Sequence, residues 1–123
     1  MSTRRRSAVR DELARDDAFR SAQDIYGSLR NEGTRIGLTT VYRALADLAD
    51  AGEVDVLRAD DGETTYRLCS AGHHHHLVCR SCGRTVEVEG RAIERWADTV
   101  AAEHGFTDVG HTVEVFGTCA SCR

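Results

Sequence analysis

The chain lacks the features that mark secreted and membrane proteins. Its 123 residues contain no apolar run near eighteen residues and no signal-peptide pattern, so we expect a soluble, cytoplasmic protein with no membrane partner. Thiols stay reduced in that compartment, and the five cysteines are therefore expected to bind metal rather than to form disulfides. Internal repeats are absent too, and the length suits one ordinary domain or two very small ones.

Lysine is also absent, and all sixteen basic residues are arginine. Arginine suits bidentate contacts to phosphate or guanine, although a G+C-rich coding genome gives the same composition. The net charge of -4 argues against a nucleic-acid binder, but it is unevenly distributed. Up to Arg43 there are nine arginines against six acids, and the remaining residues carry seven against fourteen. A net positive charge is therefore confined to the N-terminal third.

Helical patterns fill this N-terminal third. A first helix is predicted from Arg4 to about Arg15, and a second begins at Ser21 with Asp24 in the position of a capping-box acid. Apolar residues then recur at helical spacing. A third helix is expected to be capped by Thr39 or Thr40 and to end before Gly52; its apolar positions are Val41, Leu45, Leu48 and Ala49.

Two short runs with strand-like alternation follow, at residues 53–58 and 64–68. An Asp-Gly pair between them is a strong hairpin signal. Three short helices followed by a hairpin is the pattern of a winged helix-turn-helix domain, which we assign to residues 1–68.

The third helix is the candidate DNA-contacting element. Its N-terminal end, "TTVYR", offers hydroxyls, a phenol and a guanidinium, and that end of a recognition helix meets base edges and phosphates in the major groove. The residues concerned are Thr39, Thr40, Tyr42 and Arg43. The simpler interpretation is a core helix with a solvated polar face. The local positive charge and the preceding short helix favour DNA.

The second half has a different pattern. Two strands are predicted on either side of the turn "RSCGR", followed by a helix from about Arg91 to His104 and a last strand that His111 opens. The helix is expected to bury an apolar face made of Ile93, Trp96, Ala97, Val100 and Ala101. Such a β-β-α-β unit is too small to be stable alone, so a metal ion and a partner subunit are both expected. Overall we predict an α+β protein.

Two Cys-x-x-Cys pairs, Cys79 with Cys82 and Cys119 with Cys122, are the strongest chemical signal. Each pair presents two sulfurs from one tight turn, and four thiolates bind zinc tetrahedrally. Thirty-six residues separate Cys82 from Cys119, which requires the β-α-β segment between them to bring its ends together. We predict a structural zinc site. The alternative, a redox-active Cys-x-x-Cys, is a single motif that begins a helix in a thioredoxin-like fold.

Four consecutive histidines, His73–His76, precede the first pair. A purification tag would be terminal and flanked by linker residues, whereas this run leads straight into a predicted strand. In an extended segment, successive side chains point to opposite sides. His73 and His75 then face one way and His74 and His76 the other, so the run supplies one pair to each of two sites.

The first site gains its remaining ligands from residues upstream. Cys69 lies just before the histidines, and Asp55 points away from the valines on either side of it. With His74 and His76 they would supply one sulfur, two nitrogens and one oxygen, a set suitable for zinc. Taken singly, Asp55 has the simpler interpretation of a solvated acid, and Cys69 that of a small buried hydrophobe.

The second site gains its remaining ligands from downstream. Glu94 lies off the apolar stripe of its helix, and with His111, His73 and His75 it would make a nitrogen-rich set with one carboxylate. The simpler interpretations are a solvated acid for Glu94 and a core or rim histidine for His111. His104 is interpreted as a helix-end residue favoured by the helix dipole.

Three motifs resemble the ferric uptake regulator family, and most closely its zinc uptake regulator branch: "GLTTVYRALADLADAGEV" at 37–54, "HHHHLVCRSCG" at 73–83 and "TVEVFGTCASC" at 112–122. The resemblance implies a homodimer with an N-terminal winged helix and a C-terminal α/β dimerization domain. Such a dimer binds double-stranded operator DNA when loaded with zinc and represses zinc-acquisition genes. The resemblance also implies that the protein is not an enzyme and takes no small-molecule substrate.

Residue by residue, the resemblance assigns Cys79, Cys82, Cys119 and Cys122 to structural zinc. It assigns Asp55, Cys69, His74 and His76 to the sensing site, His73, His75, Glu94 and His111 to a second regulatory site, and Tyr42 and Arg43 to DNA. We place a hinge at 69–76 and the dimerization domain at 77–123. An iron, manganese or peroxide sensor of the same family and a zinc-dependent hydrolase remain alternatives; the thiolate of Cys69 favours zinc, and a saturated four-ligand site leaves no place for an activated water.

Overall fold

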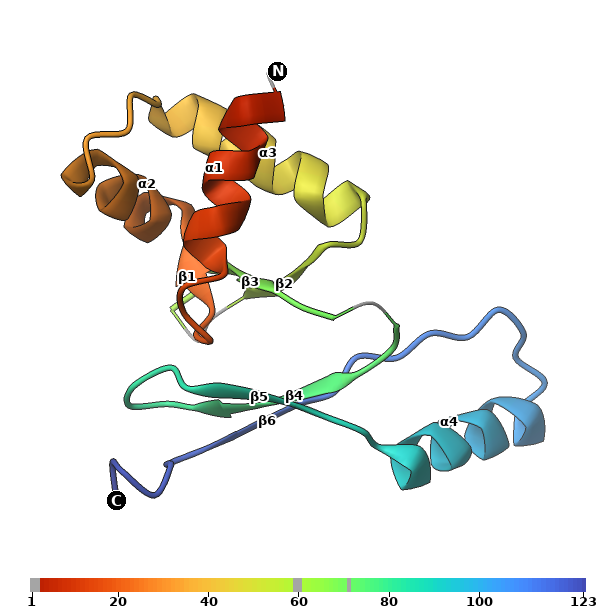
Figure 1. The fold of residues 1–123 in the computed structure, drawn as a ribbon. Helices are drawn as coiled ribbons and strands as arrows, with labels where there is room; N and C mark the ends of the chain where they lie inside the picture. Colours follow the sequence, from red (N-terminus) through yellow and green to blue (C-terminus); the bar gives the residue numbers. More distant parts are fainter. Residues whose placement is uncertain (1–2, 59–60, 71) are drawn as a thin grey trace. The chain divides into compact units, whose positions relative to one another are not determined.

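The structure, a computed structural model, describes residues 3–58, 61–70 and 72–123. The chain divides into two compact units, Met1–Ala71 and Gly72–Arg123, and the boundary falls inside the predicted hinge segment 69–76. Within the described residues there are four helices and two three-stranded sheets (Figure 1), so the α+β class is confirmed. No described helix is both long and apolar enough to cross a membrane.

Three helices build the core of the first unit: α1 (Thr3–Leu13), α2 (Ala22–Asn31) and α3 (Leu38–Asp50). Their apolar positions recur at helical spacing, so one face of each helix points inward. The largest fully buried side chains are Val9, Leu13, Ile25, Val41, Leu45 and Leu48. Burial of these faces against one another is the main stabilising term for so short a set of helices.

The two predicted helix starts have different outcomes. Ser21 caps α2 as expected, because its Oγ accepts a hydrogen bond from the Asp24 N–H at 3.1 Å. The threonine cap of α3 is wrong: α3 begins at Leu38 with Gly37 as its N-cap and no side-chain cap, so Thr39 and Thr40 lie in the first turn. Ile36 packs against the core next to this start, at the position of a hydrophobic staple, and fixes the entry of the chain instead.

The predicted hairpin is present as β2 (Val54–Arg58) and β3 (Thr64–Leu68), paired antiparallel with Val54 opposite Leu68. A two-residue strand, β1 (Arg20–Ser21), pairs with the other edge of β3 and was not predicted. Two residues are too short to show an alternation, so the sequence carries no signal for β1.

The second unit is built around β4 (His75–Cys79), the central strand of its sheet. The neighbour on one side is β5 (Thr85–Val88), which runs antiparallel, and on the other β6 (Glu114–Gly117), which runs parallel. The helix α4 (Arg91–Glu103) and the segment after it make the crossover that a parallel neighbour requires. The β-β-α-β order is as predicted.

Two details of the second unit correct the prediction. His111 does not open the last strand, because β6 starts three residues later at Glu114. The helix α4 also has no buried residue, and Trp96 is 67% exposed. Its apolar face exists as predicted, but the described part of the chain does not bury it. The end of α4 follows expectation: Gly105 has φ 73°, and the His104 Nδ1 donates to the Val100 carbonyl at 2.9 Å.

A buried ion pair fastens β1 to α1. The Arg20 guanidinium donates to the Glu12 carboxylate at 2.9 Å and also to the Glu12 backbone carbonyl; the Glu12 side chain is only 4% exposed. An exposed pair, Arg10 with Glu53 at 3.1 Å, joins α1 to the residue before β2. The Arg20–Glu12 pair is thus buried, whereas the Arg10–Glu53 pair is exposed to solvent.

Glu12→Ala should lower the free energy of unfolding of the first unit by about 3–5 kcal/mol, because it leaves the Arg20 guanidinium buried without its carboxylate. Glu53→Ala, the matched control, breaks the exposed pair and should change stability by less than about 1 kcal/mol. Urea denaturation followed by circular dichroism measures both. Similar losses for the two variants would contradict the role given to burial.

Candidate metal centres and nucleic-acid interface

The four cysteines of the two Cys-x-x-Cys pairs lie together in the second unit. Cys79 ends β4 and Cys82 lies in the turn that follows, while Cys119 and Cys122 come after β6. Because β6 runs parallel to β4, with Gly117 opposite Cys79, the carboxyl ends of both strands lie at the same end of the sheet. The four Sγ atoms lie within 4.8 Å of one another.

Hydrogen bonds shift the pKa values of two of these cysteines in opposite directions. The Cys79 Sγ accepts the Cys119 N–H at 3.3 Å, and the sulfurs of Cys82 and Cys119 are 3.7 Å apart. Backbone N–H groups, foremost that of Cys119, lower the pKa of Cys79 to about 6. The pKa of Cys122 is raised to about 12, first because its thiol hydrogen-bonds to Cys119. Four sulfurs this close ionise together only around a cation, and a tetrahedral zinc ion fits them.

The redox alternative finds no support in the local backbone. In the described structure the first pair spans the end of β4 and the turn after it, the second pair follows β6, and neither pair begins a helix. Helix N-termini and electropositive surroundings are what activate the cysteine of a redox Cys-x-x-Cys.

The side chains of His73, His75, Glu94 and His111 meet at one point in the second unit. Oε1 of Glu94, on α4, lies 2.9, 2.7 and 2.9 Å from the Nε2 atoms of His73, His75 and His111. The Nε2 atoms of His73 and His111 are 3.1 Å apart. Three ring nitrogens and a carboxylate oxygen directed at one another fit a divalent cation.

Charge at this cluster favours the ionised carboxylate. Burial by itself would raise the pKa of Glu94, but hydrogen bonds from His75, His111 and His73 outweigh it and lower the pKa to about 2. A ligating carboxylate must be deprotonated, so this one is ready to bind.

Gly90, just before α4, allows the His75 ring to occupy its position. A Cβ at Gly90 would lie 2.9 Å from Cδ2 of His75 and 3.4 Å from its Nε2, closer than side chains tolerate. The glycine therefore supports the cluster without being a ligand. The sequence did not identify this role of Gly90, because a glycine before a helix indicates only where the helix begins.

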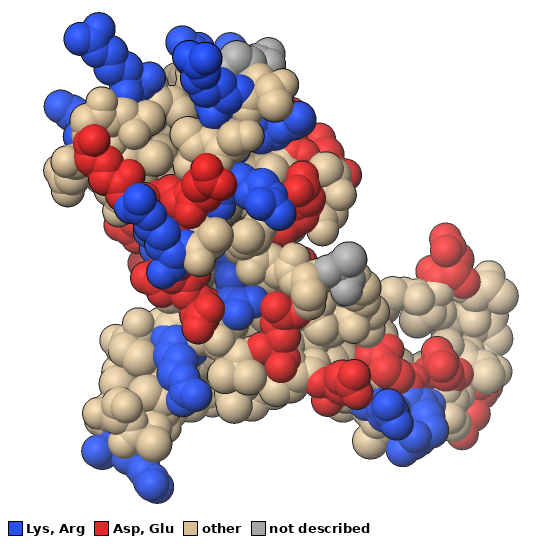
Figure 2. All heavy atoms as spheres, in the orientation of Figure 1, with Lys and Arg blue, Asp and Glu red and all other residues tan. Residues whose placement is uncertain are grey.

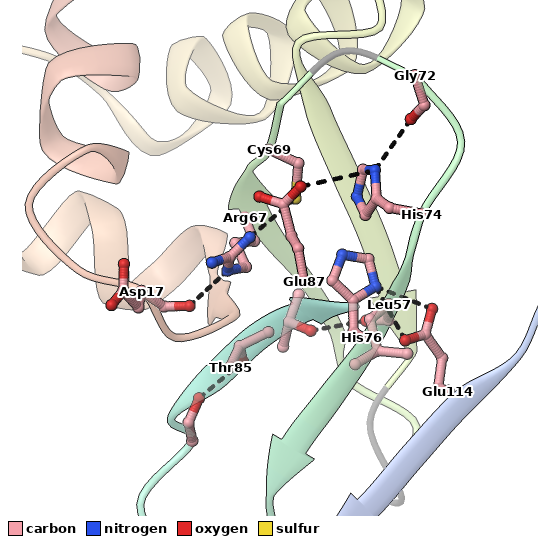
Figure 3. A network of polar contacts seen from close by, with 12 residues as sticks. Asp17, Leu57, Arg67, Cys69, Gly72, His74, His76, Thr85, Glu87 and Glu114 are labelled. Atoms are coloured by element: carbon pink, nitrogen blue, oxygen red, sulfur yellow. Dashed lines mark hydrogen bonds and ion pairs between the residues drawn. The ribbon is translucent and has the colours of Figure 1, made fainter. Parts of the chain in front are cut away.

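Two predicted ligands of the sensing site, Asp55 and Cys69, lie close together in the first unit. Asp55 is on β2, and Cys69 follows β3, where its N–H donates to the Glu53 carbonyl at 3.3 Å. Arg67 donates to the Cys69 sulfur at 3.3 Å (Figure 3). Burial, together with a hydrogen bond to Asp55, raises the pKa of Cys69 to about 12 despite Arg67. Metal binding at this sulfur must therefore release a proton.

The other two predicted ligands, His74 and His76, lie together in the second unit, with ring centroids 4.8 Å apart. The Nδ1 of His74 donates to the Gly72 carbonyl at 2.9 Å, and that of His76 donates to Glu114 at 2.9 Å (Figure 3). The structure thus sorts the four histidines into the two alternating pairs that an extended segment predicts. Because Asp55 and Cys69 belong to the other unit, the complete four-ligand site stays a prediction.

The N-terminal end of α3 is accessible. Thr39, Tyr42 and Arg43 are exposed and Thr40 is half-buried, while the opposite face of the helix is in the core. A surface hollow near the start of α1 is lined by Arg4, Arg5, Ala8, Thr34, Arg35 and Ile36. Figure 2 shows arginine side chains, in blue, projecting over the helices of the first unit. The three arginines of the hollow were not singled out from the sequence, although the net charge of this region was the signal for them.

Comparisons with known proteins identify the family of this chain. The ferric uptake regulator family matches residues 1–116. The zinc uptake regulation protein of Mycobacterium tuberculosis (strain ATCC 25618 / H37Rv) is 57% identical over 122 residues, which cover 99% of this chain and 94% of that protein.

Two solved structures are also similar. FurB from M. tuberculosis, a zinc uptake regulator, shares 56% identity with a TM-score of 0.58, over 98% of this chain and 94% of that one. A zinc uptake regulator complexed with zinc and DNA shares 28% identity with a TM-score of 0.76, over 98% and 81%. With a family match over nearly the whole length and a relative at this identity, the chain belongs to the ferric uptake regulator family.

Proposed function

We propose that the protein is a zinc-responsive transcriptional repressor. It binds operator DNA as a zinc-loaded homodimer in the cytoplasm, represses zinc-acquisition genes and has no enzymatic activity. One observation carries this proposal: the predicted sensing ligands are divided between the units, Asp55 and Cys69 in the one with the exposed α3, His74 and His76 in the other. The high identity to a zinc uptake regulation protein supports it.

The regulatory step follows from that division. An ion that is ligated by both pairs links the two units and favours the arrangement in which they hold it. In a dimer, that arrangement sets the separation of the two α3 helices, which must match the spacing of two operator half-sites. Zinc shifts this equilibrium only by its differential affinity for the two arrangements.

Dimer formation is supported by apolar surface that the second unit leaves exposed. Leu77 on β4 lies beside Val86 on β5 and Val115 on β6, and all three are 38–47% exposed. In the same unit the apolar face of α4 is exposed at Trp96. An exposed apolar stripe across a sheet marks a protein interface, and a second copy of the unit covers such a stripe symmetrically.

Zinc is favoured over iron or manganese by the sulfur of Cys69. Thiolates are soft ligands that select zinc, whereas sensors of harder ions favour oxygen and nitrogen sets such as the cluster around Glu94. That second cluster lacks a thiolate, so we propose that it fills later and tunes the response. A zinc hydrolase would need an open coordination position, and both predicted regulatory sites use four protein ligands.

Cys119→Ser should remove tightly held zinc and weaken the dimer, because metal-binding free energy is part of the folding free energy of so small a unit. Metal analysis after dialysis and sedimentation velocity measure the two effects. The matched control is Ser81→Ala, which changes an exposed residue of the Cys79–Cys82 turn and no ligand. A folded, dimeric Cys119→Ser protein with full zinc content would contradict the structural role.

Arg43→Ala should weaken operator binding by about 1–3 kcal/mol if the guanidinium reads a base, with zinc content unchanged. Arg30→Ala is the matched control, since it removes the same charge from an exposed position on α2 of the same unit. Fluorescence anisotropy with labelled operator at fixed salt and zinc measures both affinities. Equal affinities for Arg43→Ala and the unmodified protein would show that this part of α3 is only a solvated face.

Cys69→Ser should strongly weaken the zinc response while leaving the dimer and the zinc of the four-cysteine site intact. We expect the free zinc concentration for half-maximal operator binding to rise by more than about 100-fold, beyond the range of a change outside the ligand set. His111→Ala should shift it less, because it removes a ligand from the second cluster alone. The reverse ranking would show that the two histidine pairs have their roles exchanged.

A further inference from the structure

Glu114 contacts His76 but is not a predicted ligand of either histidine cluster. It begins β6, directly beside His76 on the parallel neighbour β4, so both side chains leave the same face of the sheet. Its Oε2 and Oε1 lie 2.9 and 3.2 Å from Nδ1 of His76 (Figure 3). The His76 side chain is only 3% exposed and that of Glu114 24%, so this contact is partly shielded from water.

The chemistry of this pair fixes which ring nitrogen can bind a metal. An ionised carboxylate only accepts hydrogen bonds, so Nδ1 of His76 must carry the proton. A metal ion needs a nitrogen with its lone pair available, and ligation through Nδ1 would break the contact with Glu114. Ligation therefore uses Nε2, and the negative charge behind the ring makes that nitrogen a stronger donor.

The ring of His74 is oriented in the same way, but by a neutral backbone carbonyl, which is a weaker acceptor than a carboxylate. Nδ1 of His74 donates to the Gly72 carbonyl at 2.9 Å, while the Glu87 carboxylate is 3.7 Å away, beyond hydrogen-bonding distance. Both rings of the pair thus engage Nδ1 within their own unit. The acceptor behind His76 is charged and in direct hydrogen-bond contact, so it holds its ring the more firmly.

We propose that Glu114 is a positioning residue of the sensing site: it holds the His76 ring and tautomer so that Nε2 binds zinc. The proposal rests on the function given above, in which His74 and His76 complete the ligand set of Asp55 and Cys69. Glu114 is the first residue of β6, the strand that leads to Cys119. The same strand therefore supports the sensing site at one end and the four-cysteine site at the other.

The test compares Glu114→Ala with Glu114→Gln in the full-length dimer. Glu114→Ala removes the acceptor and should weaken zinc binding at the sensing site about 10–100-fold, as loss of an outer-shell partner does. Glu114→Gln keeps a neutral acceptor oxygen and should recover most of that loss. Competition with a zinc chelator measures the affinity, and full occupancy of the four-cysteine site together with an unchanged dimer shows that the fold is intact.

A spectroscopic readout separates positioning from ligation. With cobalt at the sensing site, two absorption features should persist in both Glu114 variants. They are the charge-transfer band from the Cys69 thiolate to cobalt and the d–d bands of tetrahedral cobalt. Nitrogen-15 shifts of the zinc-loaded protein should report metal on Nε2 of His76. Glu103→Ala, which removes an exposed carboxylate at the last residue of α4, is the matched control and should leave zinc affinity unchanged.

Three results would overturn the proposal. Zinc affinity of Glu114→Ala equal to that of the unmodified protein would show that the contact positions nothing. Loss of the tetrahedral cobalt spectrum in Glu114→Gln would make Glu114 a ligand, and metal on Nδ1 of His76 would exclude the orientation proposed. Cys69→Ser, measured in parallel, separates these results from a failure of the function: if it too binds zinc and DNA normally, the sensing site itself is wrongly assigned.

Discussion

The alternation of side chains along one extended segment is the constraint on which both histidine clusters depend. From His73 to Cys79 the backbone runs into β4, and consecutive side chains leave it on opposite sides. His73 and His75 meet Glu94 on one side, while His74 and His76 pair with each other on the other side. A shift of the segment by one residue would exchange the two pairs and present each to the wrong partners. The hydrogen bonds of β4 to β5 and β6 hold this register, so the sheet determines which histidine serves which cluster.

The parallel pairing of β6 with β4 has a second consequence, because it brings distant parts of the sequence to both ends of one strand. At one end Glu114 lies beside His76, and at the other the chain leaves β6 towards Cys119 next to Cys79. Filling the four-cysteine site would hold β6 in this register and with it the carboxylate behind His76. The proposed structural and sensing sites therefore share a strand four residues long, although their ligands differ.

The second unit is small, exposes apolar surface and contributes only His74 and His76 to the predicted sensing ligands. A unit of about fifty residues with no buried residue in α4 cannot bury enough surface by itself, so metal and a second copy compensate for the thin core. The first unit, by contrast, has a core of packed helices. In the proposed function, zinc then acts on the arrangement of the units without unfolding either of them, because the rings of His74 and His76 already lie together.

The sequence by itself determined the local features: helical spacing predicted α2 to α4, and the Asp-Gly turn predicted the hairpin. Cys-x-x-Cys spacing and the histidine run predicted candidate ligands, because each of these signals spans only a few residues. It did not determine β1, which is too short to have a period, or the start of α3, where packing of Ile36 replaces a threonine cap. The sequence also predicted that Trp96 is buried, whereas the described part of the chain leaves it exposed. Glu114 behind His76 and Gly90 against the His75 ring were decided by tertiary structure alone, since strand pairing and close packing join residues whose separation in sequence carries no pattern.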